Sequence, residues 1–518
     1  MRRAAREERR ESRRAGSVFL VGAGPGDPYL MTLKGAALLR EADVVVHDRL
    51  VPEEVLRLSG GRAKMVCVGK EPGGHTLTQE EINELLLREA SAGRKVVRLK
   101  GGDPFLFGRG GEEMEYLTSR GVSVEVVPGV TSALAAPAYA GIPVTHRGVS
   151  RSLAVVTGRT CDGEADGVDW EVIARSCDTV VVLMGRGSLG EVVTRLLAGG
   201  LSPGTPAAAV QWGATASQRT VVSPLDRLEH AVIEAGLGAP MVLVVGEVVA
   251  LREKLSWWER RPLFGKTVLL LRAAGQESGM ACRLASLGAR VVHVPAIHIR
   301  HNRHPSVEEA LEGLRGFHWV VFTSPNAVTH FLQALRRRGK DARAFGDAKV
   351  LALGPATREA LRDSGLWADL VPNRHSVEGI MEAFRGEDLR GVRFLLVRSD
   401  MAPSDLREFL QGKGASVREV HPYGVEVAEG PDPALIRRFR QGEIDVVLLT
   451  SPSTARGLHR LVGEDLETIA RSAVGCIGPV TAEEAKRLGM QVAFTAEEHS
   501  GEGLVESLLR FLEFPGDE

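Results

Sequence analysis

The stretch that decides the fold of the first half is residues 98–113, RLKGGDPFLFGRGGEE. It follows an apolar, strand-like run and places Gly101, Gly102 and Asp103 at the strand exit. Further glycines free the backbone before a helical stretch that begins at Glu112. A glycine-rich turn between a strand and a helix lets the backbone approach a ligand closely, so this loop is the leading candidate for a binding site.

Apolar strand-like runs and charged helical stretches alternate on both sides of this loop, which predicts parallel βα units. The strand-like runs before and around it are SVFLVG at 17, DVVVHD at 43, KMVCVG at 64, KVVRLK at 95 and VSVEVVPG at 122. A second block with the same rhythm contains LAVVTG, CDTVVVLMG, PAAAVQWG and PMVLVVGEVV. We therefore expect two α/β lobes, 17–146 and 147–250.

Length and composition indicate a multidomain globular protein. The 518 residues are 44% hydrophobic and 25% charged, close to the average for globular proteins, and suffice for about three to four domains. The longest apolar stretch, residues 239–251, is too short to span a membrane and contains Glu247. The five cysteines form no CxxC pair, which argues against a zinc site or disulfide framework and fits a reducing cytoplasm.

Charge is distributed unevenly along the chain. Residues 1–16 carry seven Arg and three Glu without the apolar core of a secretory signal, so we expect a disordered basic extension. Residues 17–250 carry 22 basic and 27 acidic side chains, and residues 251–518 carry 36 of each. Neither part has the basic excess of a nucleic-acid-binding protein.

Together with VVPGVTSA at 126, PVTHRG at 143 and VVLMGRG at 181, the glycine loop resembles the uroporphyrinogen-III C-methyltransferases of the tetrapyrrole methylase family. The earlier turn GAGPGD at 22 lacks the spacing of a dinucleotide-binding motif. In the family, S-adenosylmethionine lies between two lobes. By position, the resemblance implies cofactor contacts from Pro25, Gly101, Gly102, Asp103, Leu106, Thr131, Ser132, Met184 and Gly213.

Two further residues fit the chemistry of carbon methylation, because a proton must leave the macrocycle after the methyl group has been added. Asp48 ends an apolar run, at the carboxyl end of a predicted strand where α/β clefts open; a helix-capping role is the alternative. Lys70 follows a strand and aligns with a family residue that is proposed as proton donor; a surface lysine that pairs with substrate carboxylates is the alternative. Among the basic residues, Arg147 is a candidate for substrate carboxylates.

The last 257 residues contain an internal repeat. GKTVLLLRAAGQ at 265 matches GVRFLLVRSDMA at 391, VVFTSPNAV at 320 matches VVLLTSPSTA at 446, and LALGPATREALRDSG at 351 matches GCIGPVTAEEAKRLG at 475. The order and duplication of these motifs resemble uroporphyrinogen-III synthase. The resemblance implies one lobe from residues 262–296 plus 426–518 and another from 297–425, after a linker at 251–261.

Few catalytic groups are expected in this half, because ring closure depends mainly on holding one conformer and assisting the departure of hydroxide. Tyr423 matches the family's tyrosine and is a candidate donor to the leaving hydroxyl; an interlobe packing role is the alternative. Ser324, Asn326, Thr450 and Ser451 follow apolar strands and are candidates for holding acetate and propionate arms. Salt-bridged structural roles are at least as good an interpretation of Arg272 and Arg398.

The sequence thus predicts a bifunctional cytoplasmic enzyme that needs no metal. It would cyclise hydroxymethylbilane to uroporphyrinogen III with inversion of ring D. It would then methylate C2 and C7 to give precorrin-2, with sirohaem, cobalamin and other products open as destinations. The family suggests a homodimer through the first half. The alternative is a methylase of the same fold that acts on RNA or protein, fused to a two-lobed ligand-binding or sensor module.

Overall fold

The computed structural model describes residues 16–59, 61–69, 77–158, 167–273, 279–302, 304–400, 402–428 and 430–513. The chain divides into two compact units. The first runs to Lys266 and includes Ala285–Arg290, and the second comprises Thr267–Leu284 and the chain from Val291 onward. The predicted basic extension falls almost entirely outside the described residues.

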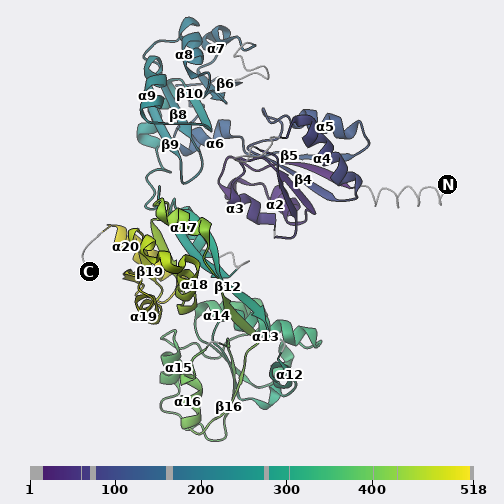
Figure 1. Ribbon diagram of the computed structural model, residues 1–518, viewed down its shortest axis with the longest axis vertical. Helices are drawn as coiled ribbons and strands as arrows, with labels where there is room; N and C mark the ends of the chain where they lie inside the picture. The colour runs from purple at the N-terminus through teal and green to yellow at the C-terminus, as the bar shows by residue number, and fades with distance from the viewer. Residues whose placement is uncertain are drawn as a thin grey trace, which may run out of the picture. The chain divides into compact units, whose positions relative to one another are not determined.

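A five-stranded parallel sheet forms the first lobe of unit 1, in the order β3-β2-β4-β1-β5 (Figure 1). Its strands are β1 (Ser17–Gly22), β2 (Val44–His47), β3 (Lys64–Cys67), β4 (Lys95–Lys100) and β5 (Ser123–Val127). The Val-rich strands are buried on both faces, as expected for a sheet covered by helices. The helices are α2 (Leu33–Arg40), α3 (Glu53–Leu56), α4 (Gln79–Ser91) and α5 (Gly110–Thr118), with the short 3-10 helices η1 (Pro28–Leu30) and η2 (Arg57–Ser59).

The second lobe of unit 1 has a mixed sheet in the order β6-β7-β10-β8-β9. Strands β6 (Leu153–Thr157) and β7 (Thr179–Leu183) are parallel, whereas β8 (Pro206–Gln211), β9 (Arg219–Pro224) and β10 (Met241–Val245) pair antiparallel. The sequence rhythm predicts parallel units throughout. Strands β8 and β9 are antiparallel instead, because the seven residues between them are too few for the crossover helix that joins parallel strands.

Helices surround this second sheet. They are α6 (Ser132–Tyr139), α7 (Trp170–Ser176), α8 (Leu189–Ala198), α9 (Leu228–Glu234) and the short η3 (Leu225–Arg227). Helix α6 precedes the predicted lobe boundary at 146, yet its alanines pack in one core with Val181, Ala208 and Val244 of the second sheet. Its amino end therefore connects the loops of one lobe with the core of the other.

The chain then continues through η4 (Glu247–Leu251) and α10 (Arg252–Leu255) into the segment predicted as a linker. Trp258 is only 6% exposed and Leu263 is fully buried. Trp258 therefore packs within unit 1, to which the chain up to Lys266 belongs.

Unit 2 contains two further sheets. The first has the order β17-β12-β11-β18-β19-β20 and the second β14-β13-β15-β16. The strands of the first are β11 (Thr267–Ala273), β12 (Arg290–His301), β17 (Tyr423–Val427), β18 (Val446–Leu449), β19 (Ala473–Cys476) and β20 (Val492–Thr495). Those of the second are β13 (Trp319–Phe322), β14 (Lys349–Ala352), β15 (Arg393–Val397) and β16 (Ser416–Val420).

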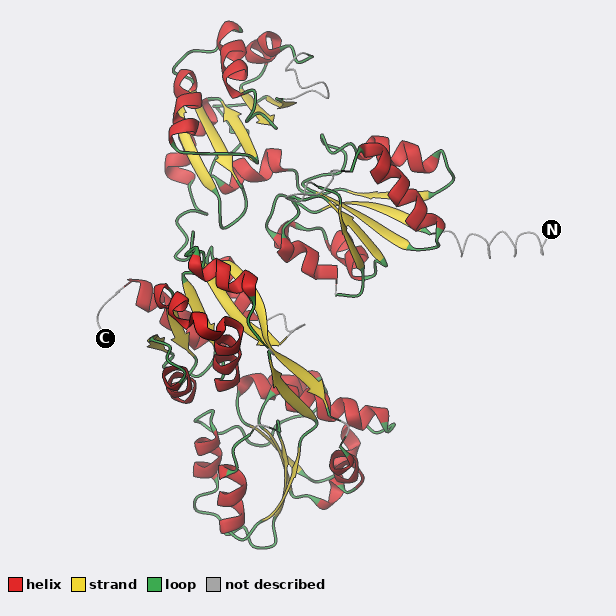
Figure 2. Ribbon diagram, in the orientation of Figure 1, coloured by secondary structure: helices red, strands yellow, loops and turns green. Residues whose placement is uncertain are grey.

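The repeat motifs fall on equivalent strands, but the two sheets exchange them. The order β11-β18-β19 in the six-stranded sheet matches β15-β13-β14 in the four-stranded sheet. Each sheet thus takes its first motif from one sequence copy and its other two from the other copy. The long β12 and its antiparallel partner β17 form a two-stranded ribbon that runs from one sheet toward the other (Figure 2).

Helices accompany both sheets of unit 2. Beside the six-stranded sheet lie α11 (Gly279–Ser286), α17 (Pro433–Arg440), α18 (Pro452–Val462), α19 (Pro479–Arg487), α20 (Gly501–Glu513) and η7 (Gly463–Arg471). Beside the four-stranded sheet lie α12 (Pro305–Glu312), α13 (Pro325–Arg337), α14 (Pro355–Asp363), α15 (Val377–Ala383), α16 (Asp405–Gly412), η5 (Leu314–Gly316) and η6 (Ala342–Phe345).

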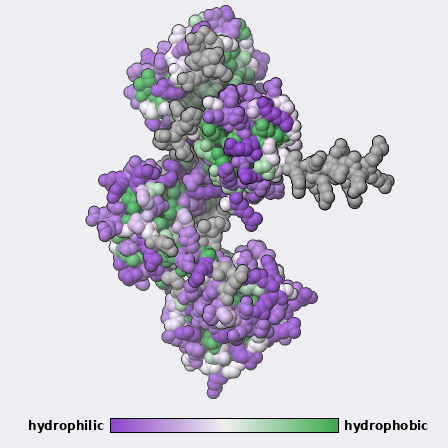
Figure 3. Space-filling model, turned by 45° about the vertical axis from the view of Figure 1, so that its right-hand side comes forward, coloured by the Kyte–Doolittle hydropathy of each residue, from purple (hydrophilic) through white to green (hydrophobic). Residues whose placement is uncertain are grey.

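The surface drawn in Figure 3 is mostly hydrophilic, with hydrophobic residues in separate patches. Within the described part of the chain, none of the helices has the length and apolar character needed to cross a bilayer. The same residues contain no cluster of three or more His, Cys, Asp or Glu side chains that could hold a metal ion.

Candidate functional site

Three loops meet at the carboxyl ends of β1 and β4 in unit 1. Gly24 and Gly102 exchange backbone hydrogen bonds of 3.2 and 2.8 Å and join the loops that follow these strands. A Cβ at Gly22 would lie 2.5 Å from the Cα of Gly129, so the loop after β5 is also packed against them. The glycines of the first turn therefore serve a close approach of three backbones.

The carboxylate of Asp103 organises this junction. Its Oδ1 accepts hydrogen bonds from the backbone N–H groups of Phe105 and Leu106, at 2.8 and 3.2 Å. Its Oδ2 accepts one from Gly129 at 3.0 Å. Asp103 was predicted to contact the cofactor, and these hydrogen bonds give its side chain a structural role in shaping the loop.

Asp48 lies beside the loop, directly after β2. Its side chain is 35% exposed, and Oδ1 forms an ion pair of 2.5 Å with Nη2 of Arg98. Oδ2 accepts a hydrogen bond of 3.4 Å from the backbone N–H of Gly101. The carboxylate is thus oriented by two partners and still reaches the surface where the strands end.

Arg98 belongs to a buried charge cluster beneath the loop. Both Arg98 Nε and Lys100 Nζ contact Oε1 of the fully buried Glu113, at 3.1 and 2.9 Å. Burial acts to lower the pKa of Arg98, but the charges of Asp48 and Glu113 outweigh it and raise that pKa overall. Burial and the charge of Arg98 lower the pKa of Lys100. Because buried charges are costly unless paired, this cluster holds Arg98, and through it Asp48, in one place.

The other predicted cofactor residues lie on loops and on the amino end of α6. Thr131 caps α6, and its hydroxyl accepts from the backbone N–H of Ala133, with Ser132 as the first helical residue. Met184 is exposed and has a positive φ of 56°. Pro25 lies between Gly24 and Gly26, both of which have positive φ, and Leu106 packs against the core of the second lobe.

Gly213 has a specific steric reason to be glycine. A Cβ there would lie 2.3 Å from the Cβ of Ala136, so the turn after β8 presses against α6. Its neighbours Trp212 and Ala214 have positive φ values of 49° and 61°. Non-glycine residues in this region are uncommon and occur preferentially at binding sites.

This arrangement fits S-adenosylmethionine. A Cβ built on Gly101 would meet nothing within 4 Å, so open space lies against the backbone at the exit of β4. Gly102 has a positive φ of 65°, which favours glycine at that position. Backbone groups of the glycine loop, with the cap of α6 nearby, would hold a polar ligand.

Two predicted residues of the first half remain outside this geometry. Lys70 lies outside the described residues. Arg147 is exposed in the loop closed by the backbone pairing of His146 with Ser150.

In unit 2, Tyr423 is buried at the start of β17, in the core of the four-stranded lobe. Its hydroxyl forms a 2.9 Å hydrogen bond with Oγ of Ser324, and its ring stacks on His330 at 5.5 Å. Burial raises the pKa of Tyr423. Two predicted residues, Tyr423 and Ser324, are therefore brought together.

The serines that follow β13 and β18 are helix caps. Ser324 Oγ accepts from the backbone N–H of Ala327 at 3.1 Å and caps α13. Ser451 forms a capping box with Thr454 at the start of α18. Asn326 lies in the first turn of α13, and Thr450 directly precedes Ser451.

Arg272 and Arg398 occupy equivalent positions of the sequence repeat. Arg398 is 2% exposed and lies 2.8 Å from Glu419, which is the salt-bridged structural role. The side chain of Arg272 lies outside the described residues.

The structure adds a site that sequence analysis missed. A pocket of about 340 Å³ is lined by the start of α19 at Gly478 and Thr481. The polar side chains of Arg374, Ser376, Glu378, Glu483 and His499 also line it. Gly478 precedes Pro479, so the backbone N–H groups of this helix start face the pocket without a capping side chain. The signal in the sequence is the Gly-Pro pair at 478–479, because a glycine at a helix start supplies no capping side chain.

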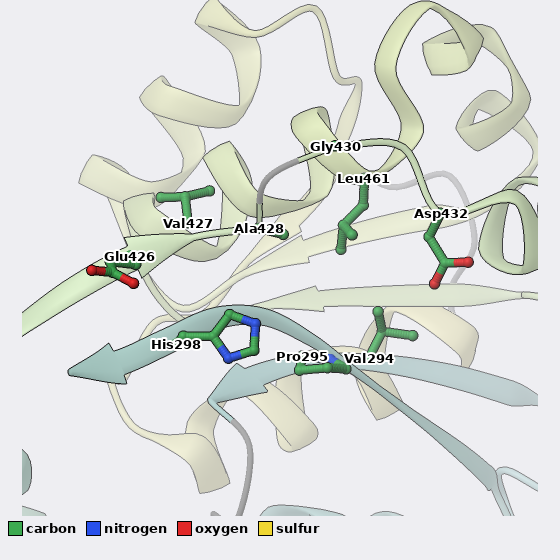
Figure 4. Close-up of a pocket in the computed structure, with 9 residues that line it drawn as sticks. All are labelled: Val294, Pro295, His298, Glu426, Val427, Ala428, Gly430, Asp432 and Leu461. Atoms are coloured by element: carbon green, nitrogen blue, oxygen red, sulfur yellow. The ribbon is translucent and has the colours of Figure 1, made fainter.

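A larger pocket of about 410 Å³ lies beside the β12–β17 ribbon (Figure 4). His298, Glu426 and Asp432 line it. Glu426 pairs with Arg300 at 2.9 Å, and Asp432 caps α17. Two acidic side chains line each of the two pockets, Glu426 and Asp432 here and Glu378 and Glu483 at α19.

The two halves match two protein families. Residues 17–229 match the family described as tetrapyrrole (corrin/porphyrin) methylases, and residues 278–506 match uroporphyrinogen-III synthase HemD. A porphyrin biosynthesis protein HemD from Ruminiclostridium josui is 36% identical over 499 residues, covering 95% of this chain and 98% of that protein.

Two proteins of Bacillus subtilis, both named uroporphyrinogen-III C-methyltransferase, also match. One is 32% identical over 504 residues, covering 95% of this chain and 99% of that protein. The other is 45% identical over 244 residues, covering 47% of this chain and 95% of that protein. The chain is thus an enzyme whose first half uses S-adenosylmethionine. It belongs to the family of fused proteins in which a tetrapyrrole methylase precedes a uroporphyrinogen-III synthase.

Proposed function

We propose that the second half cyclises hydroxymethylbilane to uroporphyrinogen III and that the first half methylates this product at C2 and C7 to give precorrin-2. The product of one half is then the substrate of the other. The observation that carries the proposal is the oriented carboxylate of Asp48 beside the open backbone of Gly101. It supports the proposal because carbon methylation needs a proton acceptor near the cofactor.

S-adenosylmethionine supplies an electrophilic methyl group on its sulfonium centre. In the proposal, the loops at Gly101 and Gly213 and the start of α6 orient the cofactor. Asp48 takes up the proton that leaves the macrocycle after a ring carbon has accepted the methyl group. Arg98 keeps the Asp48 carboxylate in place through the 2.5 Å ion pair. Lys70 stays the predicted proton donor, and Arg147 the predicted contact for substrate carboxylates.

For the second half, we propose that the pocket at α19 binds carboxylate arms of the linear substrate. The partial positive charge of the start of α19, together with the Arg374 guanidinium, supports this proposal, although Glu378 and Glu483 line the same pocket. Ser324, Asn326, Thr450 and Ser451 lie at the starts of α13 and α18 and stay the predicted contacts for the acetate and propionate arms. Tyr423 would donate a hydrogen bond to the departing hydroxyl. Because it is buried and bonded to Ser324, a movement of the ribbon would have to expose it.

We also propose a cytoplasmic homodimer with no nucleic-acid partner. The cysteines at 67, 177, 282 and 476 are free thiols, as is usual in a reducing compartment. The acidic excess of residues 17–250 supports a small-molecule substrate over RNA. Exposed Phe105, Met184 and Trp212 support a contact with a second copy or with the macrocycle.

The decisive experiment supplies purified protein with hydroxymethylbilane, with and without S-adenosylmethionine, and identifies the products by chromatography and mass. We expect uroporphyrinogen III without the cofactor and precorrin-2 with it. Formation of uroporphyrinogen I alone would refute the synthase assignment. Accumulation of unmethylated uroporphyrinogen III with the cofactor present would refute the methylase assignment.

A further inference from the structure

The segment after α10 packs onto the loops of the proposed cofactor site. Trp258 Nε1 donates a 3.0 Å hydrogen bond to the backbone oxygen of Thr215, and Trp257 Nε1 donates one of 2.9 Å to Ala138 of α6. Both indole rings also contact Tyr139, with ring centroids 5.1 and 4.8 Å apart. The guanidinium of Arg261 lies over both indoles, at 4.7 and 4.3 Å.

Tyr139 connects this aromatic cluster with the first glycine turn. Its hydroxyl donates a 2.7 Å hydrogen bond to Oδ2 of Asp27, two residues after Pro25. The same turn touches the loop after β8, because a Cβ on Gly26 would lie 2.5 Å from Cγ2 of Thr215. The loop after β1 and the loop after β8, which both carry proposed cofactor contacts, are thus held by the aromatic cluster of Tyr139, Trp257 and Trp258.

Glu259 holds the turn after β8 through a second residue. Gln218 is only 3% exposed, and its Oε1 accepts a 2.9 Å hydrogen bond from the backbone N–H of Ala214. Its Nε2 donates a 2.9 Å hydrogen bond to Oε1 of Glu259. The carboxylate therefore fixes which end of the Gln218 amide faces the turn.

Glu259 is itself firmly anchored. Its Oε1 also accepts a 2.7 Å hydrogen bond from the hydroxyl of Thr220, and its Oε2 pairs with Nη2 of Arg252 at 2.5 Å. The turn that it supports needs such support, because Trp212 and Ala214 hold positive φ values that non-glycine residues disfavour. The relay runs from Glu259 through Gln218 to Ala214, next to Gly213.

We infer that Glu259 is a positioning residue for methyl transfer, which acts through Gln218 on the cofactor-binding turn Trp212–Thr215. The inference rests on the proposed function, because Gly213 in that turn is a proposed cofactor contact. Glu259 lies between the two family matches, because the methylase match ends at residue 229 and the synthase match begins at residue 278. The inference therefore assigns part of the methylase site to this intervening segment.

The test compares Glu259→Ala with Glu259→Gln in the full-length protein. The alanine variant leaves the buried Gln218 amide without its acceptor, so the KM for S-adenosylmethionine should rise about tenfold. Its kcat at saturating cofactor should stay within about twofold, because the relay does not reach Asp48. The glutamine variant keeps an oxygen for Gln218 and Thr220 and loses only the ion pair with Arg252. Its KM should therefore stay within about threefold of wild type.

Gln218→Ala provides an independent variant, should Glu259→Ala fold poorly. It should raise the KM by the same factor, and combining the two substitutions should add nothing, since they break one relay. Glu253→Ala, an exposed glutamate on α10, is the matched control. Cyclisation by the same preparations reports on the second half.

Additive effects, or a lower melting temperature with unchanged KM in both variants, would overturn the inference and leave Glu259 as a stability residue. A wild-type protein that binds no S-adenosylhomocysteine in calorimetry would instead refute the proposed function of the loop. The two failures are therefore distinguishable.

Discussion

Asp48 in the first half and Ser324 in the second both follow a buried strand of a parallel sheet, yet they do different work. Asp48 is followed by a loop, keeps 35% of its side chain exposed and is held by a buried arginine. Ser324 is followed by Pro325, the first residue of α13, and its hydroxyl caps that helix. A polar residue at the end of a strand does not by itself predict a substrate contact. The element that follows decides whether the polar group can face a substrate.

The same contrast extends to the ion pairs. In unit 1, the buried Arg98 contacts Glu113 and also pairs with Asp48, whose side chain is partly exposed. In unit 2, the equally buried Arg398 pairs with Glu419 inside its lobe. One buried arginine orients a candidate catalytic group, and the other joins neighbouring strands.

The strongest test of this contrast is Asp48→Asn. We expect methyl transfer to fall by about 10²- to 10⁴-fold, because the base is lost. Cofactor affinity should be retained, because the asparagine still accepts from Gly101. Asp43→Asn, at the other end of β2, is the matched control, because Asp43 bonds the backbone of Lys95. Turnover at the wild-type rate in Asp48→Asn would remove the catalytic assignment.

The boundary between the halves gives the next largest effect. A protein that ends at Ser256 loses the buried Trp258, so its methylase half should be less stable by about 3–5 kcal/mol than one that ends at Lys266. Urea denaturation of the two truncated proteins measures this difference. Equal midpoints would mean that the segment is the linker that the sequence predicts.

Gly101→Ala probes the open space at the glycine loop. A Cβ at Gly101 meets no protein atom within 4 Å, so stability should be unchanged while cofactor affinity falls about tenfold, or about 1.4 kcal/mol. Gly111→Ala is the control, because its Cβ also meets nothing. Calorimetric titration of both variants decides the point, and unchanged affinity in Gly101→Ala would place the cofactor elsewhere.

Ser324→Ala and Ser451→Ala separate capping from catalysis in the second half. Each removes a helix cap at an equivalent position and should cost about 1 kcal/mol of stability. Of these two serines, Ser324 is the one that contacts the Tyr423 hydroxyl, so Ser324→Ala should slow cyclisation more than Ser451→Ala does. Equal cyclisation rates in the two variants would argue that Tyr423 is a packing residue.

The smallest effect concerns acid stability. A hydrogen bond from Arg487, supported by Arg456, lowers the pKa of Glu484 from 4.5 to about 2. A lowered carboxyl pKa stabilises the fold above pH 4.5, and this contribution is lost as the pH falls toward 2. Because such a pair is partly screened by solvent, Glu484→Gln should cost under about 1 kcal/mol. Urea midpoints at pH 6 should differ between wild type and variant, and the difference should shrink near pH 2.

Periodicity and repeats predicted the α/β class, because apolar runs of parallel strands stand out in sequence. The two families were predicted from the resemblance of the motifs. The glycine loop was also found, since close backbone approach demands glycine. The antiparallel pairing of β8, β9 and β10 was missed, because an apolar strand carries no mark of direction. The roles of Asp103, Gln218 and Glu259 were missed as well, since each depends on a partner distant in sequence or on a loop conformation that only the fold creates.

The exchange of motifs between the sheets of unit 2 has a consequence for synthesis on the ribosome. Strand β11 is made early, but its neighbour β18 belongs to the last part of the chain, with Val268 opposite Val446. The four-stranded lobe, from β13 to β16, can assemble as it emerges. The apolar β11 and β12 cannot pair with β18 and β17 until the four-stranded lobe between them in the chain has been synthesised. During that interval they are the part of the nascent chain most exposed to aggregation, and therefore the part most in need of a chaperone.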